Sequence, residues 1–328
     1  MVTRRRIVLA LGAGALAAPL ASFAQQQPRI PRIGILTPEP ITARTDLFEA
    51  FRQGLRELGY VEGQNIAIEW RSAEGRLDRF PVLAAELVSL KVDVIFTLTT
   101  PGVRAAKQAT ATIPIIMVLA ADPVATGLVT SLARPGGNVT GLTTEHPELS
   151  GKRLELLKET APKVSRVALL WNPALPNVTM RFVDIQAEAR ALGITLQSME
   201  VRSPDELVSA FEAATKERSG ALIVLQYSFA YVHRKRITDF AAKHRLPVMY
   251  PESESVEAGG LISYGPKQTD LYRRIAIYVD KILKGANPAT LPVEQPTKFE
   301  LVINMKTAKA LGIKIPNSIL VRATKVIE

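Results

Sequence analysis

The feature of this sequence that most constrains its fold is a series of apolar, strand-like runs alternating with amphipathic, helix-like segments. The expected strands of the first series lie at residues 32–37, 65–70, 92–98, 115–120 and 139–142. Helical patterns separate them, near residues 46–58, 77–90 and 102 onward. Strands that alternate with helices indicate βαβ units and a parallel sheet, whose buried strands read as unbroken apolar runs.

The series then starts again. The expected strands of the second series lie at residues 165–171, 194–201, 221–226, 247–250 and 261–263. Equivalent positions are about 130 residues apart, and the helix that ends at Leu58-Gly59 has its counterpart in one that ends at Leu192-Gly193. Any α/β chain alternates strand and helix, but the shared order of elements favours a duplication. We therefore predict two Rossmann-like lobes with parallel sheets, joined by a multi-strand hinge around a ligand cleft.

The length of the chain agrees with this organisation, because 328 residues exceed what one hydrophobic core usually serves. We expect residues 29–145 to form lobe 1, to which residues 264–297 return. Lobe 2 is expected over residues 146–263, together with residues 298–328.

The first 24 residues have the features of a secretory signal peptide. Arg4-Arg5-Arg6 precede an uncharged apolar stretch, and Ser22-Phe23-Ala24 provides small residues before a cut ahead of Gln25. The stretch is shorter than the ~20 residues that a membrane span needs. Residues 3–9 also resemble a twin-arginine signal, and Sec export stays an alternative. We predict an exported, periplasmic protein.

Composition and motifs exclude several function classes. The chain has no cysteine, which excludes disulfides, thiolate metal sites and a cysteine nucleophile. Its histidines, His146, His233 and His244, have no metal-binding spacing and no obvious nucleophile beside them. The formal net charge is +10, of which the signal carries three arginines, and the rest is spread along the chain. We expect no enzyme activity, no cofactor, no metal and no nucleic acid.

Polar residues follow the expected strands of lobe 1, where open α/β sheets bind ligands. Thr99 and Thr100 open a helix whose amino end suits a ligand carboxylate, and simple N-capping by Thr100 is the alternative. Asp122 either pairs with a ligand ammonium or caps a helix that we expect from Val124. The candidate ligand-binding residues of this lobe are Thr37, Pro38, Glu39, Thr99, Thr100, Asp122, Thr143 and Thr144.

Aromatic residues end the expected strands of lobe 2. They amount to only 6% of the chain, yet four of them fall at these ends. Rings in a cleft stack on a planar ligand or surround an ammonium group. Core packing is the alternative for each ring taken singly. The candidates of this lobe are Trp171, Asn172, Tyr227, Tyr250, Glu252 and Tyr264.

Several long blocks of the chain resemble the ABC transporter substrate-binding protein family that includes tryptophan and tyrosine binders. The blocks are LGYVEGQNI at 58–66, ARPGGNVTGL at 133–142, KRLELL at 152–157, GGLISYG at 259–265 and PTKFELVIN at 296–304. The resemblance implies a type I periplasmic-binding-protein fold, a small amino-acid-like or aromatic ligand, and delivery to an inner-membrane permease.

We therefore expect a monomeric, periplasmic solute-binding protein of an ABC importer. The alternative is a sensor that presents its ligand to a membrane receptor. A repressor of the same fold would carry a DNA-binding motif where this chain has an export signal.

Overall fold

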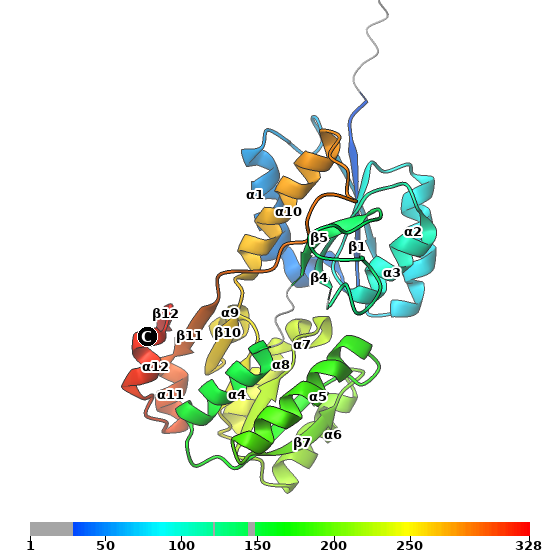
Figure 1. The fold of residues 1–328 in the computed structure, drawn as a ribbon. Helices are drawn as coiled ribbons and strands as arrows, with labels where there is room; N and C mark the ends of the chain where they lie inside the picture. The colour runs from blue at the N-terminus through cyan, green and yellow to red at the C-terminus, as the bar shows by residue number, and fades with distance from the viewer. Residues whose placement is uncertain (1–28, 121, 144–147) are drawn as a thin grey trace, which may run out of the picture. The chain divides into compact units, whose positions relative to one another are not determined.

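The computed structural model describes residues 29–120, 122–143 and 148–328. The predicted signal peptide, Thr144 and His146 lie outside these residues. Residues Pro31–Glu328 form one unit that contains two sheets. The predicted fold class, α/β with a parallel-strand sheet in each of two lobes, is confirmed (Figure 1).

The first sheet has five parallel strands in the order β2-β1-β3-β4-β5. The strands are β1 (Arg32–Thr37), β2 (Ala67–Ser72), β3 (Val94–Thr97), β4 (Ile115–Ala120) and β5 (Val139–Thr143). The helical segments among them are η1 (Ile41–Arg44), α1 (Thr45–Glu57), η2 (Leu77–Arg79), α2 (Phe80–Ser89) and α3 (Thr100–Ala109). All but β2 are almost wholly buried, as expected for a parallel sheet covered on both faces.

The second sheet has seven strands in the order β12-β11-β10-β9-β8-β6-β7. The strands are β6 (Arg166–Trp171), β7 (Thr195–Glu200), β8 (Ala221–Val224), β9 (Val248–Tyr250), β10 (Ile262–Gly265), β11 (Glu300–Asn304) and β12 (Lys325–Ile327). The helices of this lobe are α4 (Glu148–Thr160), α5 (Pro176–Ala191), α6 (Glu206–Lys216), α7 (Ser228–Val232), α8 (Arg234–Lys243), α9 (Ser253–Glu257), α11 (Met305–Leu311) and α12 (Asn317–Arg322).

Five strands of the second sheet repeat the order of the first. The order β7-β6-β8-β9-β10 corresponds to β2-β1-β3-β4-β5, with every pair parallel. The second sheet then departs from the all-parallel expectation, because β11 runs antiparallel to β10. The shared order agrees with the duplication read from the sequence.

Helix α10 (Gln268–Leu283) follows β10 but packs on the first sheet, beside α1 (Figure 1). The two helices share one apolar cluster with Phe96 and Ile116 of the sheet. Gly54 lies at their contact, where an added Cβ would stand 2.8 Å from the carbonyl oxygen of Arg273. Glycine therefore allows the close approach of α1 and α10.

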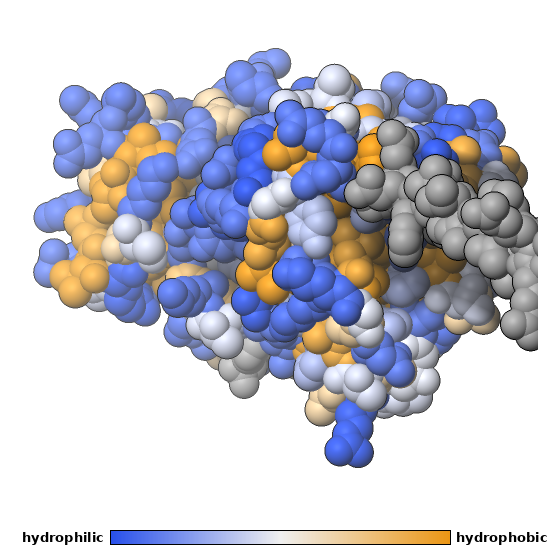
Figure 2. Space-filling model, turned by 90° about the horizontal axis from the view of Figure 1, so that it is seen from above, coloured by the Kyte–Doolittle hydropathy of each residue, from blue (hydrophilic) through white to orange (hydrophobic). Residues whose placement is uncertain are grey.

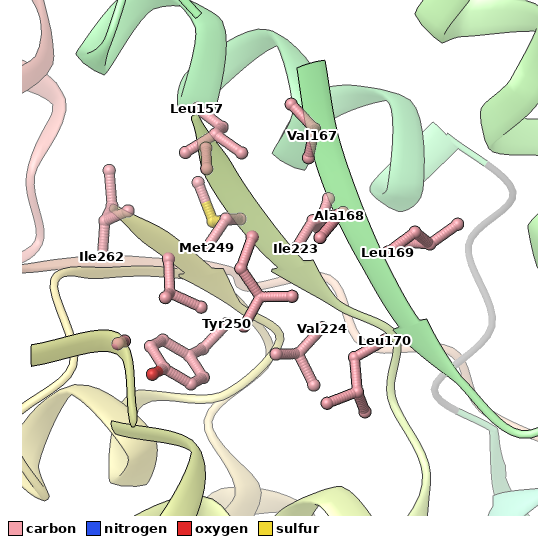
Figure 3. Close-up of a cluster of buried hydrophobic side chains, with 14 of the residues drawn as sticks. Leu157, Val167, Ala168, Leu169, Leu170, Ile223, Val224, Met249, Tyr250 and Ile262 are labelled. Atoms are coloured by element: carbon pink, nitrogen blue, oxygen red, sulfur yellow. The ribbon is translucent and has the colours of Figure 1, made fainter. Parts of the chain in front are cut away.

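The core of the second lobe forms a separate apolar cluster, part of which is drawn in Figure 3. Leucines of β6 and valine and isoleucine of β8 pack there with Met249 and Ile262. Each lobe thus buries its own apolar residues. Burial is worth roughly 25 cal/mol for each Å² of apolar surface removed from water.

The prediction of a helix from Val124 is wrong, because this segment forms a single turn. The amide of Thr126 donates to the carbonyl of Asp122, and the amide of Leu128 donates to Pro123. Gly127 then adopts φ +70°, a left-handed conformation that ends the turn. The sequence pattern over 233–244 predicts one helix, which forms as α8, with the short helix α7 before it.

The face in Figure 2 shows hydrophobic residues in separate patches among hydrophilic ones. No helix within the described residues has both the length and the apolar character needed to cross a membrane.

Candidate functional site

A cavity of about 450 Å³ is lined by loops that follow the carboxyl ends of strands in both sheets. The volume falls in the range of small-molecule sites, about 300–1,000 Å³. The lining residues of the first sheet follow β1, β2 and β3. Those of the second sheet follow β6, β7, β8, β9 and β10. The site therefore lies where open α/β sheets are expected to bind ligands.

Seven of the residues predicted from the sequence line this cavity. They are Pro38, Glu39, Thr99, Thr100, Asn172, Tyr227 and Glu252. Their contact with a ligand stays a prediction. Thr144 lies outside the described residues, and six others do not belong to the lining, namely Thr37, Asp122, Thr143, Trp171, Tyr250 and Tyr264.

Thr37 and Thr143 end β1 and β5 and are fully buried. The hydroxyl of Thr37 donates to the carbonyl of Glu39 at 2.7 Å, and that of Thr143 donates to Ala120 at 2.8 Å. Both side chains therefore form hydrogen bonds with main-chain carbonyl groups near the carboxyl edge of the sheet. Their position at strand ends was read correctly, but their hydroxyls face backbone.

Asp122 lies in the turn after β4. Its Oδ1 accepts a hydrogen bond from the amide of Ala125 at 2.9 Å. Its backbone has φ +25°, which is uncommon for a residue other than glycine. Of the two roles considered for Asp122, its side chain adopts the capping role, although it caps a turn and not a helix.

Trp171 packs inside the second lobe. Its ring stacks on Phe182 with centroids 4.2 Å apart, and its Nε1 donates to the hydroxyl of Ser198 at 2.8 Å. A buried indole that has both an apolar partner and a hydrogen-bond acceptor is fully accommodated by the protein itself.

Tyr250 is 1% exposed and lies within the apolar cluster of the second lobe (Figure 3). Tyr264 is half-buried, its ring is 5.9 Å from that of Phe299, and its carbonyl accepts from Arg153 Nε at 2.7 Å. These two rings, like that of Trp171, pack against other residues of the protein, which is the core-packing alternative.

Arg44 is a buried charged residue of the lining that was not predicted from the sequence. It ends η1 and is 2% exposed. Its Nε lies 3.3 Å from Oε2 of Glu39, and its Nη2 donates to the hydroxyl of Ser228 at 3.2 Å. Burial alone would lower the pKa of Arg44, but the attraction of Glu39 and of two tyrosines raises it above its usual value. The side chain is therefore held as a cation.

Helix α7 connects the two lobes at this point. Tyr231 follows the second sheet, yet its ring belongs to the apolar cluster of α1 and α10. Its hydroxyl donates to Oδ2 of Asp46 at 3.4 Å, and the guanidinium of Arg44 lies 4.3 Å from the ring centroid. Because neighbouring residues of α7 line the cavity, this helix is both a cavity wall and an interlobe contact.

The amino end of α3 forms part of the cavity lining. Thr99 is the N-cap, and its hydroxyl accepts from the amide of Gly102 at 3.4 Å. Thr100 and Pro101 line the cavity in the first turn. The capping role belongs to Thr99 instead of Thr100, and the helix dipole gives this end a partial positive charge.

Glu252 contributes a buried carboxylate from the opposite lobe. It is 4% exposed, and its Oε1 accepts from the hydroxyl of Ser255 at 3.0 Å. Burial raises the pKa of Glu252, and this effect outweighs the hydrogen bond of Ser255 and the attraction of Arg153. A cationic group in the cavity would stabilise its charged form.

Two buried oxygen atoms of the lining residues have no hydrogen-bond partner within the described part of the chain. They are the hydroxyl of Tyr227 and Oε1 of Gln268, the first residue of α10. An unsatisfied buried polar atom costs about 1–3 kcal/mol. Gln268 was not among the predicted residues, although it follows the candidate Tyr264 by four positions.

The described residues contain no group of three or more His, Cys, Asp or Glu side chains arranged around a common point.

Comparison with known proteins relates the chain to binding proteins. The sequence profile of ABC transporter substrate binding proteins matches residues 33–327. A tyrosine-binding protein of Clostridioides difficile strain R20291 is 28% identical over 266 residues, which are 81% of this chain and 76% of that protein.

Solved structures show the same likeness. A conserved domain protein of Vibrio cholerae superposes with a TM-score of 0.84 at 29% identity, covering 90% of this chain and 99% of its own. An ABC domain of Streptococcus pneumonia in complex with L-Trp has a TM-score of 0.83 at the same identity and coverage. The periplasmic binding ribose operon repressor protein of Lactobacillus acidophilus, 16% identical with a TM-score of 0.57 over 80% of this chain and 94% of its own, shares the fold alone. The type I periplasmic-binding-protein fold expected from the sequence is confirmed.

Proposed function

We propose that this chain, which belongs to the ABC transporter substrate-binding protein family, binds an aromatic amino acid in the cavity between its sheets and delivers it to a membrane permease. That it is a substrate-binding protein follows from the family. The ligand and the delivery are the proposal. One observation carries it: a single cavity combines aromatic rings with buried groups that suit both charges of an amino acid.

The charged ends of an amino acid have complementary groups on opposite sides of the cavity. The amino end of α3, with Thr99 and Thr100, suits the carboxylate, because the helix dipole gives this end a partial positive charge that attracts an anion. Glu252, from the other lobe, suits the ammonium group. A zwitterion would thus contact both lobes at once.

The rings that line the cavity favour an aromatic side chain. Tyr227, Phe229 and Tyr231 lie within one short segment of the lining, and the rings of Tyr227 and Phe229 are nearly parallel, with centroids 5.9 Å apart. Each ring that contacts a ligand ring contributes about 0.5–1.5 kcal/mol beyond area burial. Two relatives agree with this class of ligand, one being a tyrosine-binding protein and the other having been solved with L-Trp.

A ligand that contacts both lobes favours the arrangement in which both contacts are made. Such a ligand stabilises lobe closure by its differential affinity for the closed state. We infer that the closed surface is the one a permease recognises. The signal-like residues 1–24 support export to the periplasm, where such a protein would work.

Thermal unfolding tests the ligand class. The purified protein is mixed with each of the common amino acids, and its melting temperature is followed. A ligand at a hundredfold excess over Kd adds about 2.7 kcal/mol of stability, which raises Tm by several degrees. We expect this rise for one or more aromatic amino acids, whereas a rise confined to other amino acids would contradict the proposal.

A further inference from the structure

We propose that Arg44 determines the specificity of the cavity for ligands that carry a free carboxylate. The inference rests on the proposed function, because it assigns one contact of an amino acid that the cavity would bind. It concerns a residue that no sequence pattern identified.

Arg44 is the most buried arginine of the cavity lining. Its side chain is 3% exposed, whereas those of Arg76 and Arg202 on the same lining are 70% and 49% exposed and pair with Asp78 and Glu200. The fourth arginine of the lining, Arg181, is partly buried, and its Nη1 donates to the carbonyl of Gln226 at 3.0 Å. Screening by solvent weakens the attraction of exposed charges for an anion, and a desolvated donor bonds more strongly. A carboxylate in the cavity would therefore gain most from Arg44.

Three contacts fix the orientation of the Arg44 guanidinium. Nε faces Glu39, Nη2 donates to Ser228, and the planar face lies over the ring of Tyr231. A guanidinium that is held in this way loses little further side-chain entropy when a ligand binds.

The same contacts leave part of the guanidinium edge unused. Of its five N–H donors, Nε faces Glu39, one N–H of Nη2 bonds Ser228, and the hydroxyl of the buried Tyr272 is a further hydrogen-bond neighbour of the guanidinium. Because Arg44 lines the cavity, we assign the two remaining donors to a ligand. A charge-assisted bond from one of them would be among the stronger contacts of the site.

The amino end of α3 lines the same cavity and supports this position for the carboxylate. Thr99 and Thr100 belong to the same lobe as Arg44. Glu39 already balances the charge of Arg44, so the partial positive charge of the helix end is needed to complement a second anion. Together, the guanidinium edge and the helix end would receive one carboxylate.

The test compares L-tryptophan with L-tryptophanamide, which keeps the ring and the ammonium group but has no carboxylate. Both are titrated into the full-length protein by calorimetry at about pH 6, where both amino groups are protonated. The variant is Arg44→Gln. The control is Arg52→Gln, because Arg52 likewise pairs with an acid, Glu62, and lies over a ring, that of Trp70, but is absent from the cavity lining.

We expect the parent protein and Arg52→Gln to bind L-tryptophan about 10- to 100-fold more tightly than the amide. In Arg44→Gln this ratio should fall to within about threefold of unity, mainly through weaker binding of L-tryptophan. Should Arg44→Gln fail to fold, Arg44→Lys replaces it. Lysine keeps the charge but not the fork of donors, and we expect its ratio to lie at least threefold below that of the parent.

An equal loss of both ligands in the variant would overturn the inference, because Arg44 would then act only through its contacts with Ser228 and Tyr231. A parent protein that binds acid and amide equally would overturn it too, and would leave the proposed function standing. A parent that binds no aromatic amino acid would instead contradict the proposed function itself.

Discussion

The guanidinium of Arg44, which follows the first strand of one sheet, lies 4.3 Å from the ring centroid of Tyr231, which follows a strand of the other sheet. A second guanidinium, that of Arg234, lies 4.4 Å from the same centroid. The ring is thus a point at which the two lobes make contact. Both partners of the first pair also line the cavity, so contact between the lobes and occupation of the cavity involve the same side chains.

Replacing Tyr231 should show how much its ring contributes. Tyr231→Phe removes only a 3.4 Å hydrogen bond to Asp46 and should cost less than about 1 kcal/mol. Tyr231→Leu also removes two cation–π contacts, each worth about 0.5–2 kcal/mol, so it should cost about 1–4 kcal/mol. Urea unfolding of both variants measures the difference, and equal costs would show that the ring itself contributes nothing.

The two aromatic residues Trp171 and Tyr227 both follow strands of the second sheet but should differ in function. Trp171→Phe loses the hydrogen bond to Ser198 and should lower stability by about 1 kcal/mol, with unchanged ligand affinity. Tyr227→Leu should weaken the binding of an aromatic ligand about 2- to 10-fold. Titration calorimetry measures the ligand affinity of the two variants. Weaker binding by Trp171→Phe would contradict the assignment of Trp171 to the core.

Stability should fall as the pH rises from about 4.5 to 7. Burial, followed by the repulsion of Glu252 and Asp46, raises the pKa of Glu254 from 4.5 to about 7. The folded state then binds a proton that the unfolded state has already lost, so the stability gained from this proton is complete below pH 4.5 and disappears by about pH 7.

Unfolding by urea at several pH values measures this dependence. Glu254→Gln, which resembles the protonated side chain, should remove most of the slope. Glu155→Gln, at an exposed position that pairs with Lys152, serves as the control and should keep it. An unchanged slope in Glu254→Gln would show that another group titrates.

Gly141 should tolerate no side chain. It has φ +126°, and an added Cβ would lie 2.2 Å from the carbonyl oxygen of Met117 in the neighbouring strand. Gly141→Ala should therefore cost at least about 3 kcal/mol. Gly193 has φ +63° with open space around it, so Gly193→Ala should cost only about 1 kcal/mol. Chemical unfolding that gave similar costs would contradict the close approach of β4 and β5.

The strands were predictable because a strand buried in a parallel sheet has an unbroken run of apolar residues in the sequence. The run Ile115–Ala120 is apolar throughout, and it forms β4. The helix expected after it was wrong for a reason that is also local, since Gly127 adopts a left-handed conformation that pattern reading did not weigh. The antiparallel strand β11 could not be foreseen, because strand direction depends on pairing with β10 and not on its own residues.

The position of the cavity at the strand ends was predictable, whereas the side chains that line it were predictable only in part. Strand ends are visible in a sequence, and seven residues chosen there line the cavity. The direction of a side chain is not visible, so Trp171 and Tyr227 looked alike although one packs on Phe182 and the other lines the cavity. Arg44 was missed because its partner Ser228 lies 184 residues further along the chain.

The central claim is that the cavity between the sheets binds an aromatic amino acid, and calorimetric titration of the ligand-free protein tests it most directly. We predict saturable binding of L-tryptophan, L-tyrosine or L-phenylalanine, with a negative heat-capacity change from burial of the ring, and weaker binding by Tyr227→Leu. If none of the three produces binding heat at any temperature tried, while the protein is folded, the account is contradicted.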